Sequence, residues 1–305
     1  MKFPLSKYIW FDGKLVPVNM AKVPVTTHAI HYGTSIFEGI RAYWNSKNLH
    51  VFRLKDHVKR FRNSGKFYNI KLNFSDKQIE NAVIDLCKKN KIKKSCYIRP
   101  FYFVGQYGIN FHVTQKAPTH TAIFAFPFGD LFNKSGITAT ISKWRKFSDM
   151  STPTQAKMGG NYLNSILATQ DAKQRGFDEA ILLDQSGNVS EAPGENIFLV
   201  KNNKLVTPSL SSSALDGITR RSIITLSKDM KLKIKTQKVS KKELKMADEI
   251  FLSGTAAEIT PVIKIDKKKI GEGKVGNITK LFMDTYSDIV MNKSENYSHW
   301  LTVVY

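Results

Sequence analysis

The chain has 305 residues, enough for two α/β domains with separate hydrophobic cores. No apolar run reaches the roughly 18 residues of a membrane span, and the N-terminus lacks a signal-peptide core, so we expect a cytoplasmic protein with no membrane partner. The formal net charge of +22 raises the possibility of nucleic-acid binding. Because the lysines are spread over every segment, we expect a solvated basic surface and no nucleic-acid partner.

The first half of the chain predicts a hairpin, two helices and two strands. An Asp-Gly turn joins two β-rich runs, which is typical of a hairpin. Apolar residues at helical spacing indicate one helix over 58–68, and a capping box of Ser75 and Gln78 begins another. β-branched and aromatic runs predict the strands Tyr97–Val104 and Thr121–Phe126.

The second half alternates further strands with helices. A helix is expected from Asn161 to Gly176, a second begins near Ile218, and Ser240 with Glu243 forms another capping box. The expected strands are Ile137–Ile141, Glu179–Leu183, Asn188–Ser190, Ile197–Val200, Glu249–Ser253 and Ile259–Ile265.

A turn-rich, aperiodic segment over 127–137 separates the two halves. The sequence therefore predicts a smaller N-terminal α/β domain over 1–126, an interdomain loop over 127–137, and a larger C-terminal α/β domain over 138–305. Runs of strands with inserted helices favour α/β layers of the α+β type over a doubly wound sheet.

Several common sites are missing from the sequence. There is no glycine-rich dinucleotide fingerprint, no phosphate loop and no zinc-protease motif. His28 and His31 lie at helical spacing without a third ligand nearby, so we interpret both as packed, hydrogen-bonded residues and predict no metal site. Cys87 and Cys96 form no disulfide framework, and both are expected in the core.

Lys157 has the most distinctive surroundings of the lysines. Gly159 and Gly160 follow it and allow backbone to approach a ligand, and a helix begins directly afterwards. A lysine at such a site can lose its proton and form a Schiff base with an aldehyde. In a lysine-rich chain, however, a surface charge is the commoner explanation of any single lysine.

Six blocks in order make the chain resemble the fold-type IV pyridoxal-phosphate aminotransferases, and among them the bacterial branched-chain enzymes. The resemblance runs from Tyr8 to about Met283. The blocks are His28–Arg41, Tyr97–Pro100, Gln155–Tyr162, Ser190–Asn196, Gly217–Arg220 and Ser253–Pro261.

The resemblance implies a cofactor, pyridoxal 5'-phosphate, at the domain interface. Lys157 would bind the cofactor covalently and then move a proton, and Glu191 would keep the pyridine nitrogen protonated. Arg60 would grip the phosphate, although a solvated helical arginine is the alternative. The remaining implied cofactor residues are Tyr162 at the phenolic oxygen, and Ile218, Thr219, Gly254 and Thr255 at the phosphate.

The resemblance also implies a substrate pocket. Tyr97 and Arg99 lie two apart on a strand and so face the same side; the arginine would reach the distal carboxylate of glutamate or 2-oxoglutarate, with a cross-strand ion pair as the alternative. Tyr32, Phe37 and Gly39 would form the apolar wall. Arg41 would position the interdomain loop, and Thr255, Ala256 and Ala257 would offer donors to the α-carboxylate.

The implied reaction exchanges an amino group between branched-chain L-amino acids (leucine, isoleucine, valine) and 2-oxoglutarate by a ping-pong mechanism. The alternatives are a D-amino acid aminotransferase and an aminodeoxychorismate lyase of the same fold. The resemblance further implies a homo-oligomer, either a dimer or a hexamer built as a trimer of dimers, with part of the pocket wall from a neighbouring subunit. Departures from the family pattern at Phe128, Leu131, Met158 and Pro193 bear on specificity.

Overall fold

The computed structural model describes residues 6–305, which form two compact units. The first unit contains the chain up to Gly129 together with Ala156–Gly160 and Asp288–Tyr305, and the second contains Asp130–Gln155 and Asn161–Ser287. Two short segments, one from the middle of the chain and one at its C-terminal end, thus belong to the first unit. The sequence analysis placed both segments in the C-terminal domain, because a sequence does not show which distant strand a segment pairs with.

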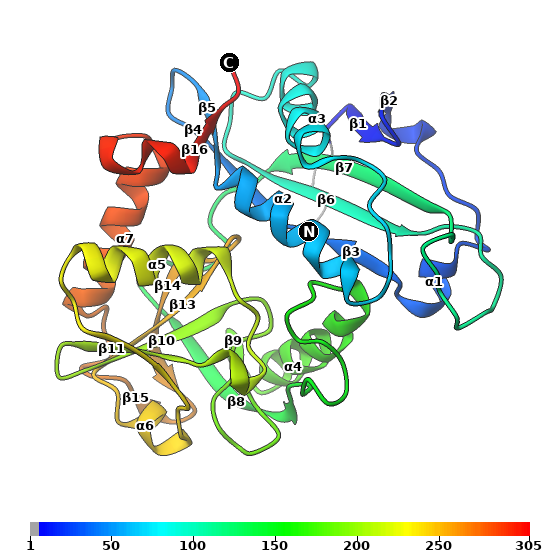
Figure 1. The fold of residues 1–305 in the computed structure, drawn as a ribbon. Coiled ribbons are helices and arrows are strands. Elements are labelled where there is room, and N and C mark those ends of the chain that lie inside the picture. The colour runs from blue at the N-terminus through cyan, green and yellow to red at the C-terminus, as the bar shows by residue number, and fades with distance from the viewer. Residues whose placement is uncertain (1–5) are drawn as a thin grey trace. The chain divides into compact units, whose positions relative to one another are not determined.

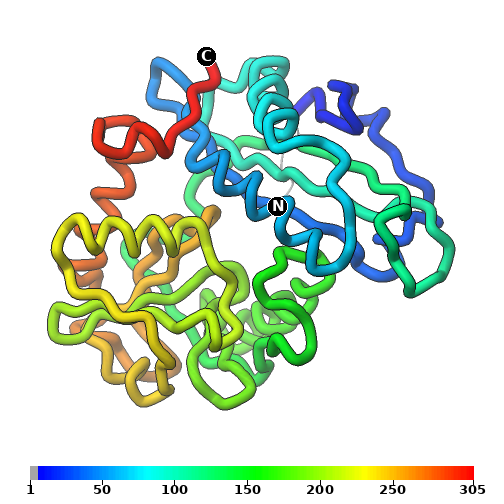
Figure 2. The backbone as a smooth tube through the Cα atoms, viewed as in Figure 1, coloured from blue at the N-terminus to red at the C-terminus, as the bar shows by residue number. Residues whose placement is uncertain are grey.

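The first unit is built on an antiparallel sheet in the order β16-β5-β4-β6-β7-β1-β2, with β3 paired to β6. The C-terminal β16 lies beside β5, near residue 50 (Figure 2). The strands are β1 (Tyr8–Phe11), β2 (Lys14–Pro17), β3 (Ser35–Phe37), β4 (Ile40–Trp44), β5 (Leu49–Phe52), β6 (Cys96–Val104), β7 (Thr119–Pro127) and β16 (Leu301–Val303).

Helices α2 (Leu54–Lys66) and α3 (Asp76–Lys89) lie together on one face of this sheet, and a short α1 (His28–Tyr32) precedes β3 (Figure 1). Both long helices are amphipathic, and each buries its apolar side chains in the core. The predicted capping box of Ser75 and Gln78 is confirmed at the start of α3.

The second unit is built on a mixed sheet in the order β12-β11-β10-β13-β14-β8-β9, with β15 paired to β14. The pairs β11–β12, β14–β8 and β8–β9 are parallel. The strands are β8 (Ile137–Arg145), β9 (Glu179–Leu183), β10 (Asn196–Lys201), β11 (Lys204–Pro208), β12 (Ile234–Gln237), β13 (Glu249–Gly254), β14 (Glu258–Ile265) and β15 (Lys268–Lys269).

Helix α4 (Tyr162–Gln174) packs on β8 and β9, and α5 (Ile218–Asp229) packs on β12 and β13. Two further helices are α6 (Lys241–Lys245) and α7 (Asn277–Val290). Short 3-10 turns occur at Val18–Met20, Gly159–Asn161, Leu210–Ser212 and Glu295–Trp300.

The predicted elements are largely confirmed, with one wrong and several missed. The first hairpin, both capping boxes and the α/β composition are present. The predicted strand Asn188–Ser190 is wrong: only Val189 makes an isolated bridge, to Leu183. The elements that were not predicted are α1, α7, β3, β4, β5, β11, β12, β15 and β16. Within residues 6–305, no helix is long and apolar enough to span a membrane.

Candidate active site

The segment carrying Lys157 is attached to β3 and α2 of the first unit. The backbone N–H of Lys157 donates to Ser64 Oγ (3.0 Å), and its carbonyl accepts from the N–H of Phe37 (3.1 Å). Gly160 N–H donates to Gly33 O (3.2 Å), and a Cβ on Gly33 would lie 3.0 Å from Gly160 Cα. The glycines therefore permit two backbones to approach closely, and the hydrogen bonds of the Lys157 backbone hold this segment in place.

The Lys157 ammonium lies in cationic surroundings. Its Nζ is 4.8 Å from the centre of the Phe37 ring. Burial and the charges of Arg60 and Arg99 lower the pKa of Lys157 to about 8, while Glu38 and Tyr97 act in the opposite direction. A depressed pKa increases the fraction of neutral amine, which is the form that attacks a carbonyl or accepts a proton.

This pKa predicts how Lys157 reacts in the apo-protein. Because the amine loses its proton near pH 8, we expect its acetylation by trace acetic anhydride to reach half its maximum near that pH. Free Nα-acetyl-lysine in the same tube, with an ordinary pKa of about 10.4, should still gain reactivity well above a pH of about 9. Peptide mass spectrometry measures both, and a Lys157 profile that follows the free amine would contradict the assignment.

Glu38, between β3 and β4, is a fully buried carboxylate that organises the adjacent helix α2. It accepts from Arg60 Nε (2.7 Å) and Arg60 Nη2 (2.9 Å), and from His57 Nδ1 (2.8 Å). Burial alone raises the pKa of Glu38, but Arg60 and His57 outweigh it and hold that pKa well below its ordinary value. Arg60 is thus held by a bidentate ion pair within a cluster that also contains Lys157.

Tyr97 and Arg99 do lie together on β6. Arg99 Nη2 donates to the Tyr97 hydroxyl (3.2 Å), and its guanidinium lies over the Phe37 ring at 4.7 Å. Arg99 Nε is buried without a hydrogen-bond partner among residues 6–305. A buried donor left without a partner is costly, and an anionic substrate group would satisfy it.

Arg41 and Gly39 fix the surroundings of Tyr97. Arg41 pairs with Tyr97 across β4 and β6, and its Nη2 donates to Phe128 O (3.2 Å). The Phe128 ring packs against both Arg41 and Tyr97. A Cβ on Gly39 would overlap the Tyr97 hydroxyl, so a larger residue here requires the Tyr97 side chain to move.

Gly39→Ala should therefore displace Tyr97. Overpacking of this kind costs about 1–3 kcal/mol, and we expect a lower midpoint of thermal unfolding together with a raised KM for substrate. Gly129→Ala is the matched control, because nothing lies within 4 Å of its added Cβ. Equal behaviour of the two variants would show that the predicted clash is absent.

Tyr32 is not part of this cluster in the single chain. It is half exposed on α1, where it contacts Ile109 O and the rings of Phe111, His28 and His31. Nearby His28 is buried and donates through Nε2 to Asn110 O (3.0 Å). His31 is hydrogen-bonded but exposed, so the expectation that it is packed was wrong.

In the second unit, Glu191 is a buried carboxylate with three partners. Its Oε1 lies 2.6 Å from Lys146 Nζ, and its Oε2 accepts from Asn196 Nδ2 (3.2 Å) and the N–H of Leu215 (2.9 Å). Burial lowers the pKa of Lys146, but Glu191 outweighs it and raises that pKa above the ordinary value. Lys146 was not predicted as a site residue.

The start of α5 and the turn after β13 supply backbone donors in the same unit. Ile218 and Thr219 are buried in the first turn of α5, which has no side-chain cap; such a helix start favours an anion. Gly254 ends β13, and Thr255, Ala256 and Ala257 form the turn to β14. Beside it, Ser253 Oγ is buried without a hydrogen-bond partner in the described chain.

Tyr162 is the first residue of α4 and borders a pocket of about 410 Å³. Pro193 and Gly194 also line this pocket, and the Pro193 carbonyl accepts from Ser165 Oγ (2.7 Å). The structure thus places the predicted residues in two groups, one in each unit. The group in the first unit consists of Phe37, Gly39, Arg41, Arg60, Tyr97, Arg99 and Lys157. The group in the second unit consists of Tyr162, Glu191, Ile218, Thr219 and Gly254–Ala257.

Comparison with known proteins identifies the family of the chain. The family model described as amino-transferase class IV matches residues 35–265. A protein of Aquifex aeolicus named as a probable branched-chain-amino-acid aminotransferase is 41% identical over 302 residues, covering 98% of this chain and 97% of the relative.

Solved structures give the same result. The crystal structure of the Escherichia coli branched-chain amino acid aminotransferase superposes with a TM-score of 0.95 at 41% identity, covering 98% of this chain and all of that one. The branched-chain amino acid aminotransferase of Thermobaculum terrenum, solved in its PLP-bound holo form, gives 0.93 at 33% identity and covers 99% of each chain. The chain belongs to the class IV aminotransferase family and has the fold-type IV architecture.

Proposed function

We propose that this protein is a pyridoxal-phosphate-dependent transaminase that exchanges the amino group between branched-chain L-amino acids and 2-oxoglutarate. The observation that carries the proposal is Lys157, whose pKa is lowered to about 8 beside Arg60, Tyr97 and Arg99 in a chain of this family. Relatives named for the branched-chain reaction, at 41% identity over nearly the whole chain, support the substrate class.

The residues present fit the cofactor. When bound, pyridoxal phosphate supplies an electron-withdrawing ring that stabilises negative charge at the substrate α-carbon. We propose that Lys157 holds its aldehyde carbon and that Tyr162 contacts its phenolic oxygen. Phosphate binding falls to Arg60, Ile218, Thr219, Gly254 and Thr255, and the buried Ser253 Oγ without a partner in the described chain supports a polar ligand beside that turn.

Glu191 is proposed to face the ring nitrogen and keep it protonated. The carboxylate is held rigidly because Asn196 and the Leu215 N–H both donate to Oε2. Lys146 Nζ binds the other oxygen, Oε1, at 2.6 Å in this structure. The carboxylate is therefore oriented before any ligand arrives.

The proton step follows from the same geometry. Lys157, once its amine is neutral, takes a proton from the substrate α-carbon. It returns the proton to the carbon on the other side of the substrate nitrogen, so that one side chain acts first as base and then as acid. A pKa near 8 suits both roles close to neutral pH. Two such half-reactions, with the amino acid leaving as a keto acid before 2-oxoglutarate enters, make the proposed cycle ping-pong.

Two kinds of substrate must share the pocket. Phe37 and Gly39, with Tyr32 as a proposed contribution to the wall, offer apolar surface to an aliphatic side chain, and Arg99 offers a cation to the distal carboxylate of glutamate. The Phe37 ring lies under the Arg99 guanidinium at 4.7 Å. An arginine stacked on an aromatic ring can present its apolar face or its N–H edge. The proposed role of Thr255, Ala256 and Ala257 is to bind the α-carboxylate.

The direct test is stereospecific amino transfer. Purified protein with pyridoxal phosphate, L-leucine and 2-oxoglutarate should form L-glutamate, whereas D-leucine should give no product. Glutamate formation from D-leucine would favour a D-amino acid aminotransferase, and pyruvate release from aminodeoxychorismate without transamination would favour the lyase.

Arg99→Ala separates the two substrates of the proposed reaction. We expect the KM for 2-oxoglutarate to rise roughly 10- to 100-fold, because a charge-assisted hydrogen bond contributes about 1.5–3 kcal/mol. The KM for L-leucine, measured in the same preparation, serves as the internal control and should change much less. Equal losses on both substrates would reject the role of Arg99 in selecting the acidic one.

A homo-oligomeric assembly and a cytoplasmic location stay predictions. The effects of Phe128, Leu131 and Pro193 on specificity also stay predictions. In the first unit the Phe128 ring packs on Tyr97 and its carbonyl accepts from Arg41, which supports a part for this residue in shaping the proposed pocket.

A further inference from the structure

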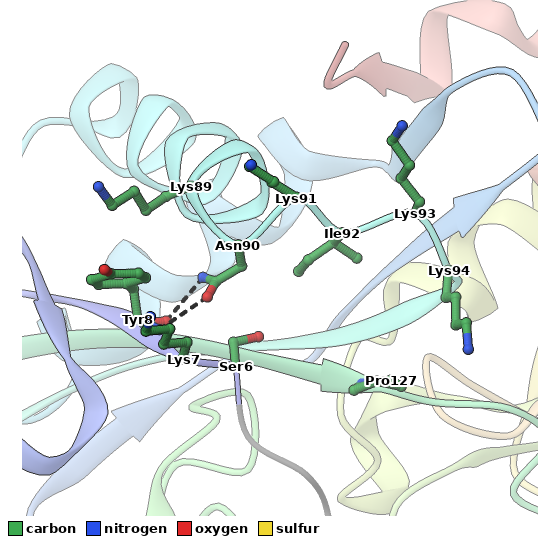
Figure 3. A pocket seen from close by; sticks show the side chains of 10 residues that line it. All are labelled: Ser6, Lys7, Tyr8, Lys89, Asn90, Lys91, Ile92, Lys93, Lys94 and Pro127. Carbon is green, nitrogen blue, oxygen red and sulfur yellow. Dashed lines mark hydrogen bonds between the residues drawn. The ribbon is translucent and has the colours of Figure 1, made fainter.

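A second pocket, of about 640 Å³, lies in the first unit at the carboxyl end of α3 (Figure 3). It is formed by the start of β1, the end of α3 with the loop that follows, and the end of β7. Five of its ten lining residues are lysines, although only 47 of the 305 residues of the chain are Lys or Arg. The lysines are Lys7, Lys89, Lys91, Lys93 and Lys94.

Hydrogen bonds join two of the segments that line this pocket. Asn90 Oδ1 accepts from the N–H of Tyr8 (2.9 Å), and Asn90 Nδ2 donates to the carbonyls of Tyr8 (3.0 Å) and Leu86 (2.9 Å). Figure 3 shows the bonds between Asn90 and Tyr8, which join the end of α3 to β1. The backbone beside Lys7, Lys89 and Lys91 is therefore positioned before a ligand binds.

No acidic side chain among the described residues neutralises the charge of the pocket. None of the ten lining residues is acidic, and within residues 6–305 none of the five lysines forms an ion pair. Elsewhere the chain does pair its lysines, as in Lys201–Asp248 (2.7 Å) and Lys134–Glu258. Lys89 Nζ and Lys7 Nζ instead lie 4.8 and 5.7 Å from the centre of the Tyr8 ring.

We propose that this pocket binds a small polyanion that carries two or more phosphate groups. Each ammonium offers three donors on a flexible stem, so several lysines can close around clustered phosphate oxygens. The pocket volume lies within the roughly 300–1,000 Å³ typical of small-ligand sites. A long nucleic acid is less suited, because it needs a basic stripe along its backbone. The proposal does not depend on the transaminase function.

The test is calorimetric titration of the whole protein with tripolyphosphate at moderate salt. Lys89→Gln/Lys93→Gln/Lys94→Gln should weaken binding at least about tenfold, because charge-assisted contacts are lost. Lys267→Gln/Lys268→Gln/Lys269→Gln removes the same charge from three exposed lysines of the second unit and should change affinity less than about twofold. If both variants weaken tripolyphosphate binding equally, the effect comes from net charge alone and the proposed site is rejected.

Two further measurements, one by lysine acetylation and one with a DNA duplex, test the same site. In the unaltered protein, tripolyphosphate should protect Lys89 and Lys93 from acetylation more than it protects Lys267 to Lys269. This measurement needs no variant, so it stays informative if the triple variant fails to fold. Citrate at the same concentration should protect less, and equal protection would overturn the phosphate preference. Tighter binding of a short DNA duplex through the same lysines would assign the pocket to nucleic acid instead.

Discussion

Lys157→Ala should lower the rate of amino transfer by at least about 10⁴-fold, because it removes both the nucleophile and the proton carrier. The variant should still fold, since the backbone bonds of position 157 to Ser64 and Phe37 do not use the side chain. Steady-state glutamate formation measures the loss, and circular dichroism checks the fold. Lys59→Ala, an exposed lysine on α2, is the control and should stay within about twofold of the parent.

Two outcomes would contradict this account. Activity of Lys157→Ala within tenfold of the parent would mean that another lysine carries the chemistry. If Lys157→Ala loses both activity and secondary structure, the loss of activity could come from unfolding. Lys157→Arg then separates the two effects, because it retains the charge and length but has no nucleophilic amine. We expect Lys157→Arg to be folded and inactive. A folded and active Lys157→Arg would reject the role.

Glu38→Gln should destabilise the first unit by roughly 3–5 kcal/mol, because removing one partner of a buried ion pair leaves the other charge uncompensated. Arg60 would lose its bidentate carboxylate, and His57 would lose its charged acceptor. We also expect weaker cofactor retention, since Arg60 would no longer be held in place. Chemical denaturation measures the free energy of unfolding.

The control for Glu38 lies on helix α2, which also carries His57 and Arg60. Asp56→Asn removes a partly exposed ion pair with Arg53, and such pairs contribute about 0–1 kcal/mol.

The pH dependence of the Glu38→Gln effect gives a second check. Because the pKa of Glu38 is lowered on folding, its stabilisation is complete above the unfolded value of 4.5 and is lost as the pH falls through the lower folded value. The difference between parent and variant should therefore be largest near neutral pH and shrink in acid.

The sequence predicted those parts of the fold whose signals are local. The first hairpin depends on an Asp-Gly turn, and the starts of α3 and α6 depend on capping boxes that link the N-cap residue to the third residue after it. The predicted strand over 188–190 failed because Asn188 and Ser190, on either side of Val189, are poor β-formers, and the backbone hydrogen bonds of this segment to 182–184 do not extend into a regular ladder. Only a bridge at Val189 remains.

The candidate site was only partly visible in the sequence, because its organisation depends on contacts between distant positions. Glu38 lies in a recognised block, but its partners are 19 and 22 residues away. The spacing of His57 and Arg60 on one helical face was the only available signal. Lys146 was not distinguishable, since a single lysine in a lysine-rich chain looks like a surface charge until Glu191 is seen beside it.

The same limit applies to the segment around Lys157. Nothing local indicates that Ala156–Gly160 joins the first unit, since the contacts of Gly160 with Gly33 and of Met158 with Ile36 link positions far apart in the chain. The glycines after the lysine did indicate a close backbone approach. The partner in that approach could be identified only from the structure.

The most direct measurement of the central claim is to reduce the purified protein with borohydride in the presence of pyridoxal phosphate and to map the modified peptide by mass spectrometry. We expect the phosphopyridoxyl mass on Lys157, in a stoichiometry of one per chain, with the neighbouring lysines unmodified. Modification of a different lysine, or scattered modification that stays the same in Lys157→Ala, would contradict the assignment of this amine as the one that holds the cofactor.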